Sequence, residues 1–191
     1  MLANQAANWL VGGEEPTRMG NNHPNVVPYR GYAVRDGHVI VAVGNDKQFA
    51  RLCEVLEEEA LATDPRFRSN ADRVRNREEL DAALGALLAG WPRAALIERL
   101  ESVGVPCGPI NALADVFADE QVRARGLEVA MARDDGTPIR TLAFPARLSR
   151  TPANYRRAPP SLGADTDEIL SSFLGIGDAE LDALRRGRVI G

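Results

Sequence analysis

The stretch Gly20-Asn-Asn-His-Pro-Asn-Val-Val-Pro-Tyr29 leads directly into two strand-like segments, and together these segments decide the fold. Residues 29–34 and 39–43 are rich in β-branched and aromatic side chains, and Asp36-Gly37 lies between them. An Asp-Gly pair suits a tight hairpin turn, because the central residues of that turn need positive φ. We therefore predict a hairpin over 29–44. The second strand is apolar at every position, which predicts that both of its faces are buried in a sheet.

A helical pattern follows the hairpin from Asp46 to Val103. Apolar residues at helical spacing predict one helix that begins at Asp46, with Asp46 as its N-cap, and a second helix that contains Leu80 and Leu84. Pro92 suits the first turn of a third helix. Further along, we expect helices near 70–77, 115–125, 165–174 and 178–186, the last two capped by Thr166 or Asp165 and by Asp178, and a second hairpin around Asp134-Asp-Gly136.

Length, composition and charge limit the function classes. The chain has 191 residues, 45% of them hydrophobic, which suits one substantial domain or two small ones. A net charge of -4 offers no basic surface for nucleic acid. Arginines and acidic residues alternate over Arg66–Arg77, which we interpret as a solvated helix face. No apolar run approaches the roughly 18 residues that cross a bilayer, so we expect no membrane association and a cytoplasmic location.

Two further segments occur later in the chain: Gly104-Val-Pro-Cys-Gly-Pro-Ile-Asn111, whose prolines and glycine predict a tight turn, and Arg157-Ala-Pro-Pro-Ser-Leu-Gly-Ala-Asp-Thr-Asp-Glu-Ile-Leu170. With the segment from Gly20, and in this order, they resemble the family III CoA-transferases. This group includes formyl-CoA transferase, carnitine CoA-transferase and alpha-methylacyl-CoA racemase. The resemblance implies a mixed α/β fold, comprising the small domain and C-terminal tail of such an enzyme without its N-terminal nucleotide-binding-type half.

The resemblance also implies a domain organisation. We expect residues 1–28 to be the end of a helix from the large domain plus a loop, 29–145 to be a small α+β domain, and 146–191 to be a Pro-rich linker with C-terminal helices that return to the large domain. Leu2–Leu10 carries an apolar stripe, so we interpret Met1 as an internal or alternative start. Family members form interlocked homodimers, which implies a homo-oligomer or a partner that supplies the missing half.

The resemblance implies a chemistry as well. In this family an aspartate carboxylate attacks an acyl-CoA thioester, and CoA passes through an aspartyl thioester to a second carboxylic acid. Coenzyme A thioesters and carboxylic acids are therefore the implied substrates, with no covalently bound cofactor. No position here matches the motif around that aspartate, so we assign no nucleophile and expect this chain alone to be inactive. The alternatives are the 2-methylacyl-CoA racemase branch, or a non-catalytic subunit or binding module of a split enzyme.

The candidate site residues are Gly20, Asn21, Asn22 and His23. A glycine-containing loop with side-chain amides can close over a polar substrate and donate hydrogen bonds to a carboxylate. The alternative is that these residues are present because turns favour them, and nothing in the sequence supplies a partner to orient His23. Asp46 is a second candidate, since an acidic residue at the corresponding place in the racemase branch supports a catalytic histidine. For Asp46 we favour the N-cap interpretation.

Overall fold

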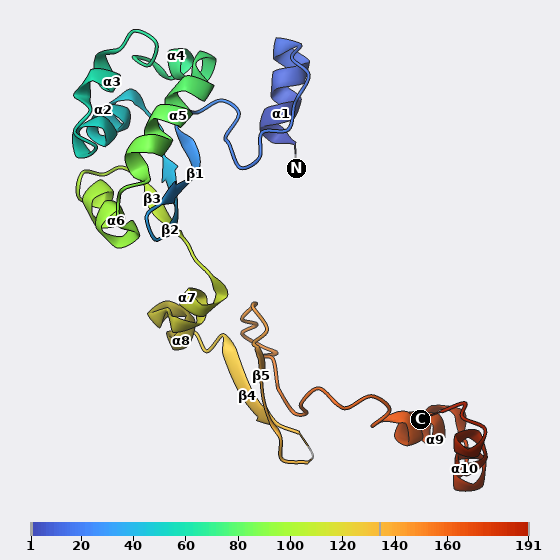
Figure 1. Ribbon diagram of the computed structural model, residues 1–191. Helices are drawn as coiled ribbons and strands as arrows, with labels where there is room; N and C mark the ends of the chain where they lie inside the picture. The colour runs from blue at the N-terminus through green and yellow to red at the C-terminus, as the bar shows by residue number, and fades with distance from the viewer. Residues whose placement is uncertain (1, 134, 191) are drawn as a thin grey trace. The chain divides into compact units, whose positions relative to one another are not determined.

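The computed structural model describes residues 2–133 and 135–190, which form two compact units, 1–112 and 113–191 (Figure 1). Helices and short strands occur in both units, so the prediction of a mixed α/β fold is confirmed. The division between the units falls inside the range 29–145 that the sequence suggested as a single domain.

The first unit opens with helix α1 (Ala3–Ala7), which continues into the π-helical turn η1 (Asn8–Gly12). Gly13 ends it in the left-handed conformation at φ 71°, as the Gly12-Gly13 pair predicts. No residue of α1 or η1 is buried within the described chain, and Leu10 and Val11 are among the most exposed apolar side chains. The apolar stripe of this helix is therefore not covered within the first unit.

The sheet of the first unit has three antiparallel strands in the order β1-β2-β3, where β1 is Tyr29–Val34, β2 is Gly37–Ala42 and β3 is Cys107–Ile110. The predicted hairpin is confirmed, with Val34 opposite Gly37. The tight turn predicted around Cys107 is wrong, because this segment pairs with β2 in the register Val41 to Cys107. Pro109 is tolerated there because β3 is an edge strand.

The central strand β2 is buried on one face only. Val39 and Val41 are fully buried, whereas Ile40 between them is 42% exposed. The prediction that both faces of this strand are buried is therefore wrong. The physical reason is that the helices pack against a single face of the sheet, so alternate side chains on β2 meet the core and the solvent.

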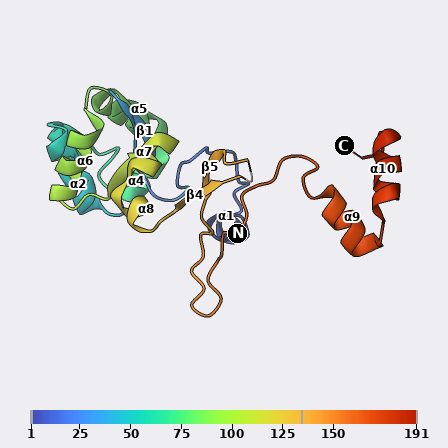
Figure 2. The same ribbon diagram turned by 90° about the horizontal axis from the view of Figure 1, so that it is seen from below.

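Five helices complete the first unit: α2 (Asp46–Val55), α3 (Glu59–Thr63), α4 (Asn70–Arg75), α5 (Arg77–Leu88) and α6 (Arg93–Ser102). α5 lies beside β1 in both views (Figures 1 and 2). The core joins the buried strand face to helix residues that are at most 1% exposed, among them Phe49, Leu52, Leu80, Leu84, Leu88, Leu96 and Leu100. The predicted helical stripes thus form one hydrophobic core.

Side chains cap the first turns of α2 and α4, and the cap of α2 differs from the predicted one by one residue. The side chain of Asn45, not Asp46, caps α2 by accepting a hydrogen bond from Gln48 N at 3.0 Å. Ser69 caps α4 in a capping box with Asp72. Asp46 is therefore free of the capping role that the sequence suggested for it.

The second unit contains α7 (Leu113–Ala118), α8 (Glu120–Ala124), the hairpin of β4 (Glu128–Ala132) and β5 (Pro138–Leu142), and the helices α9 (Thr166–Leu174) and α10 (Asp178–Arg186). The hairpin is confirmed, although Asp134 lies outside the described residues. The predicted caps of the last two helices are wrong, since neither has a side-chain cap hydrogen bond. Asp165 instead accepts a hydrogen bond from Arg157 at 2.5 Å.

None of the described helices has by itself the length and apolar content to cross a bilayer. α5 and α6 meet those two criteria only when taken together, as a pair bent by 115°.

Candidate functional site

The loop 20–28 begins with a turn in which Asn22 N donates to Met19 O at 3.1 Å. Gly20 has φ 59°, a left-handed conformation that glycine adopts without a Cβ clash. The Asn22 side chain reinforces the turn, because its Nδ2 donates to the same carbonyl at 2.8 Å. The turn that the sequence predicts here is therefore present, and the backbone and side chain of Asn22 both stabilise it.

Asn21 is the most accessible side chain of the candidate set. Its Oδ1 accepts from Gly31 N at 3.4 Å, which ties the loop to β1, and its Nδ2 makes no hydrogen bond to any described residue. Asn22 differs, since its Oδ1 is buried and lacks a hydrogen-bond partner among the described residues. Asn21 therefore has a donor that can reach a ligand, and Asn22 has an acceptor that the first unit leaves unsatisfied.

His23 is held on three sides. Its backbone N donates to Tyr29 O at 3.0 Å, and its ring stacks on Tyr29 with centroids 5.2 Å apart. Asn25 N donates to Nδ1 at 3.1 Å, and the side-chain amide of Asn4 lies 3.2 Å from Nε2. The orienting partner that the sequence could not identify is thus supplied by Asn25 and Tyr29.

Three side chains from α4 and α5 hold the main chain at the base of this loop. Asn70 Nδ2 donates to Asn25 O at 2.8 Å, while Asn70 Oδ1 accepts from Val27 N at 3.1 Å. Arg77 Nη2 donates to Pro24 O at 2.7 Å. Arg73 Nε donates to Val27 O at 2.7 Å. The segment from Pro24 to Val27 is therefore fixed by side chains that sequence reasoning did not select.

Arg73 is fully buried, so interpreting Arg66–Arg77 as a uniformly solvated face is wrong at this position. Its guanidinium also donates to Phe67 O at 3.0 Å and to Asp46 Oδ1 at 2.8 Å, and lies 4.5 Å from the centre of the Phe49 ring. Helical spacing does not reveal this burial, because Arg73 belongs to α4, which ends at Arg75, whereas the buried leucines lie on the separate helix α5.

Asp46 reaches the candidate loop only through Arg73. Its side chain is 59% exposed and forms the ion pair that balances the buried guanidinium. Within the described chain, no contact links Asp46 to any residue of Gly20–His23. Gly20, Asn21, Asn22 and His23 therefore lie together in one loop. Asp46 is linked to that loop only through Arg73, which bonds both Asp46 and Val27 O.

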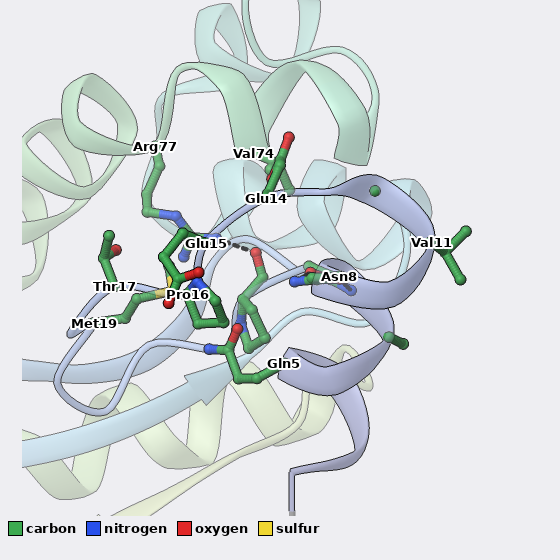
Figure 3. Close-up of a pocket in the computed structure, with 14 residues that line it drawn as sticks. Gln5, Asn8, Val11, Glu14, Glu15, Pro16, Thr17, Met19, Val74 and Arg77 are labelled. Atoms are coloured by element: carbon green, nitrogen blue, oxygen red, sulfur yellow. Dashed lines mark hydrogen bonds between the residues drawn. The ribbon is translucent and has the colours of Figure 1, made fainter.

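Two cavities in the first unit flank the loop. One, of about 680 Å³, lies between α1 and the start of α5 and is lined by Gln5, Asn8, Met19 and Arg77 among others (Figure 3). The other, of about 600 Å³, is lined by Met19 and Asn22 from the loop, by Arg30 from β1 and by Asp81 from α5. Met19, which directly precedes the loop, and Arg77 line both cavities, so they lie between two cavities that could admit polar ligands.

A partly buried polar network forms part of the second cavity's wall. Asp81 accepts from Tyr32 Oη at 2.8 Å and from Arg30 Nη1 at 3.0 Å. Burial, and then the neighbouring Asp81 carboxylate, raise the pKa of Tyr32 well above its ordinary value. Tyr32 therefore stays protonated and acts as a donor to Asp81, a structural role in which it supplies no base.

Comparison with known proteins settles the family. The family model described as CoA-transferase family III matches residues 1–166. The chain belongs to the family III CoA-transferases. Succinate--glutarate CoA-transferase of Agrobacterium fabrum is 40% identical over 186 residues, which are 97% of this chain and 44% of that relative. The crystal structure of a CAIB/BAIF family protein from Brucella suis superposes with a TM-score of 0.73 at 43% identity, over 90% of this chain and 44% of that one.

A relative that is itself one subunit also matches this family III chain. The Succinyl-CoA--L-malate CoA-transferase beta subunit of Chloroflexus aurantiacus is 31% identical over 165 residues, 85% of this chain and 41% of that subunit. The chain thus spans less than half the length of the curated relatives it matches.

Proposed function

We propose that this chain supplies the small domain of an enzyme that transfers CoA from an acyl-CoA thioester to a carboxylic acid, with a dicarboxylic acid as acceptor. The observation that carries the proposal is the 40% identity to a succinate–glutarate CoA-transferase over 97% of the chain. Glutarate, and the malate named for the Chloroflexus relative, are both dicarboxylic acids. Succinyl-CoA is accordingly the proposed donor.

The proposed reaction follows four balanced steps. An aspartate carboxylate, absent from this chain, attacks the thioester carbon of the donor, and the C–S bond breaks to give a mixed anhydride and CoA thiolate. The thiolate then attacks the aspartyl carbonyl and releases the donor acid. The acceptor carboxylate attacks the resulting aspartyl-CoA thioester and frees the thiolate again, which finally attacks the acceptor's acyl carbon and regenerates the aspartate.

In this scheme the loop 20–28 contributes hydrogen-bond donors. Asn21 Nδ2, which is exposed and unpartnered among the described residues, suits a substrate carboxylate or the oxyanion that develops at the reacting carbonyl. A donor on a clamped loop is more useful than one on a mobile loop, because its position need not be reorganised during the reaction. The contacts of Asn70, Arg73 and Arg77 with the loop backbone support that assignment.

A second candidate is that the chain works as a separate subunit beside a partner that carries the aspartate. The match to a relative named as a beta subunit favours this possibility. The exposed apolar side chains of α1 and η1, including Leu10 and Val11, would then meet the partner. In either case the predicted homodimer, the domain ranges 1–28, 29–145 and 146–191, and the cytoplasmic location remain predictions.

The experiment is a chimera. The part of the Agrobacterium relative that this chain does not cover is fused to this chain at the matched boundary, or co-expressed with it as a separate polypeptide. CoA transfer from succinyl-CoA to glutarate, malate or acetate is followed by chromatography. Racemisation of a 2-methylacyl-CoA is measured in a separate reaction without an acceptor acid. We expect transfer to the dicarboxylic acids and none by the chain alone. Racemisation without transfer, or activity of the chain alone, would overturn the proposal.

A further inference from the structure

Asn70 uses both ends of its side-chain amide on the backbone of a segment that lies far away in sequence. Its Nδ2 donates to Asn25 O at 2.8 Å and its Oδ1 accepts from Val27 N at 3.1 Å, and these partners lie 45 and 43 positions away in the sequence. Asn70 is not needed to cap α4, since Ser69 does so with Asp72. The amide therefore serves the distant loop and is not required by its own helix.

Asn25 passes this constraint to His23. Both backbone polar groups of Asn25 form hydrogen bonds. Its carbonyl oxygen accepts from Asn70 Nδ2, and its N–H donates to His23 Nδ1 at 3.1 Å. The Asn25 side chain is also fixed, by reciprocal hydrogen bonds with Asn8 at 3.0 and 3.1 Å. The Asn25 backbone therefore has little freedom to move away from the imidazole.

The direction of this hydrogen bond determines where the imidazole proton lies. A backbone N–H can only donate, so Nδ1 must be the unprotonated nitrogen, and the neutral ring carries its single proton at Nε2. The Asn4 amide nitrogen Nδ2 lies 3.2 Å from Nε2, and a half-turn of this amide places its oxygen there instead, as an acceptor for the Nε2 proton. Asn4 is exposed, so another acceptor can compete with it for this proton.

We propose that Asn70 is a positioning residue that holds His23 as its Nε2–H tautomer, so that His23 donates a hydrogen bond to a substrate carboxylate and does not act as a base. The inference rests on the proposed function, since it assigns a role to a loop of that site. Asn70 itself touches neither substrate nor reacting atoms. Asn70 acts through the Asn25 backbone, and removal of the Asn70 amide should change the tautomer of the His23 ring.

The tautomer can be read directly in the chain as it exists, without any activity. The sequence contains two histidines, and His38 lies exposed on β2, where it serves as an internal reference. Long-range ¹H–¹⁵N correlation spectra of the ¹⁵N-labelled chain separate the protonated from the unprotonated ring nitrogen. The wild type should show His23 almost entirely as the Nε2–H form. A wild-type His23 that is a mixture of tautomers would overturn the proposal.

The variants are Asn70→Ala, which removes both contacts, and Asn70→Asp, which keeps the acceptor for Val27 N and loses the donor to Asn25 O. Asn76→Ala is the matched control, because the Asn76 amide donates to Arg66 O and Asp72 O, each at 3.0 Å, and does not contact the loop. Both Asn70 variants should move the His23 signals toward a mixture of tautomers, while His38 and the control remain unchanged. Unchanged His23 signals in a folded Asn70→Asp variant would overturn the proposal, and this variant decides the matter if Asn70→Ala does not fold.

Catalysis is tested separately in the chimera. Asn70→Asp should raise KM for glutarate about tenfold with little change in kcat, because a donor to a substrate carboxylate stabilises the ground state and the transition state alike. An equal rise in KM in Asn76→Ala would contradict a specific role. If the wild-type chimera is inactive, the proposed function is wrong. The tautomer measurement still tests the positioning of His23 by Asn70, because it needs no activity.

Discussion

Replacing Arg73 by Met tests the buried guanidinium at the centre of the first unit. The side chain is fully buried and makes three hydrogen bonds, to Val27 O at 2.7 Å, Phe67 O at 3.0 Å and Asp46 Oδ1 at 2.8 Å. Methionine fills a similar length with an apolar chain and offers no donor. The two carbonyls lose their partner inside the protein, which is the main cost of the substitution.

The magnitude follows from which of these groups water can reach. The Asp46 side chain is 59% exposed and is hydrated again in the variant, so loss of its ion pair with Arg73 costs about 1 kcal/mol or less. Each carbonyl that is left without a donor costs about 1–3 kcal/mol. Loss of the guanidinium over Phe49 adds roughly 0.5–2 kcal/mol, while removal of a buried charge offsets part of the total. We expect Arg73→Met to lower the free energy of unfolding by about 3 kcal/mol.

The assay is urea denaturation followed by tryptophan fluorescence in a Trp9→Phe background, so that Trp91, which packs against the core, is the reporter. Arg75→Met is the matched control, because Arg75 is 69% exposed and pairs with Asp72 on the helix surface. We expect the control to change stability by less than about 0.5 kcal/mol. A stability loss in Arg73→Met no larger than in the control would show that the buried hydrogen bonds of Arg73 do not stabilise the fold.

Three further predictions concern the same unit. Asn45→Ala should lower stability by about 1 kcal/mol in the urea assay, because it removes the N-cap of α2. Tyr32→Phe should cost about 1–2 kcal/mol in that assay, since it leaves one oxygen of the largely buried Asp81 side chain without its donor. Burial raises the pKa of the Cys53 thiol to about 11, above its ordinary 9.0, so native Cys53 should resist iodoacetamide at pH 8, as judged by mass spectrometry. Because the folded-state pKa is the higher one, the contribution of Cys53 to stability is complete below pH 9 and is lost as the pH rises toward 11.

Each of these predictions has its own control. Lys47→Ala, next to the true cap, should leave stability nearly unchanged, and an equal loss in both variants would contradict the role of Asn45. For Tyr32→Phe, Asp81→Asn should be at least as destabilising, because it weakens the contacts with both Tyr32 and Arg30. For Cys53, labelling in urea should proceed at the rate of an ordinary thiol. Rapid labelling of the native chain would show that the thiol is not buried.

The local elements of the fold could be predicted from the sequence because their signals are local. The hairpin of β1 and β2 follows from Asp36-Gly37, and α5 from the spacing of its leucines. Strand β3 could not be predicted in this way, since its pairing of Ile110 with His38 joins residues that lie far apart in sequence. Its prolines and glycine carry a turn signal that pairing at the sheet edge overrides.

The candidate loop was found by its composition and by resemblance, whereas the side chains that hold it were missed. Asn70 and Arg77 reach the backbone of residues 24–27 across the fold, and no periodicity in the sequence reveals such contacts. The charged neighbours of Arg73 favour a solvated helix face, but its guanidinium is buried because it bonds carbonyls of Val27 and Phe67 that only the tertiary fold brings near. For Asp46, a shift of one residue moves the cap to Asn45 and leaves the carboxylate to pair with Arg73.

The loop Gly20–His23 is proposed to take part in CoA transfer, and this role can be measured. The most direct measurement is kcat/KM for succinyl-CoA to glutarate transfer by the chimera carrying Asn21→Ala or His23→Gln, compared with the unmodified chimera. We predict a kcat/KM at least about tenfold lower in each variant, while each variant unfolds in urea at nearly the wild-type midpoint. Activities within about twofold of the unmodified chimera in both variants would contradict this role, and would leave the loop as a turn with no part in the chemistry.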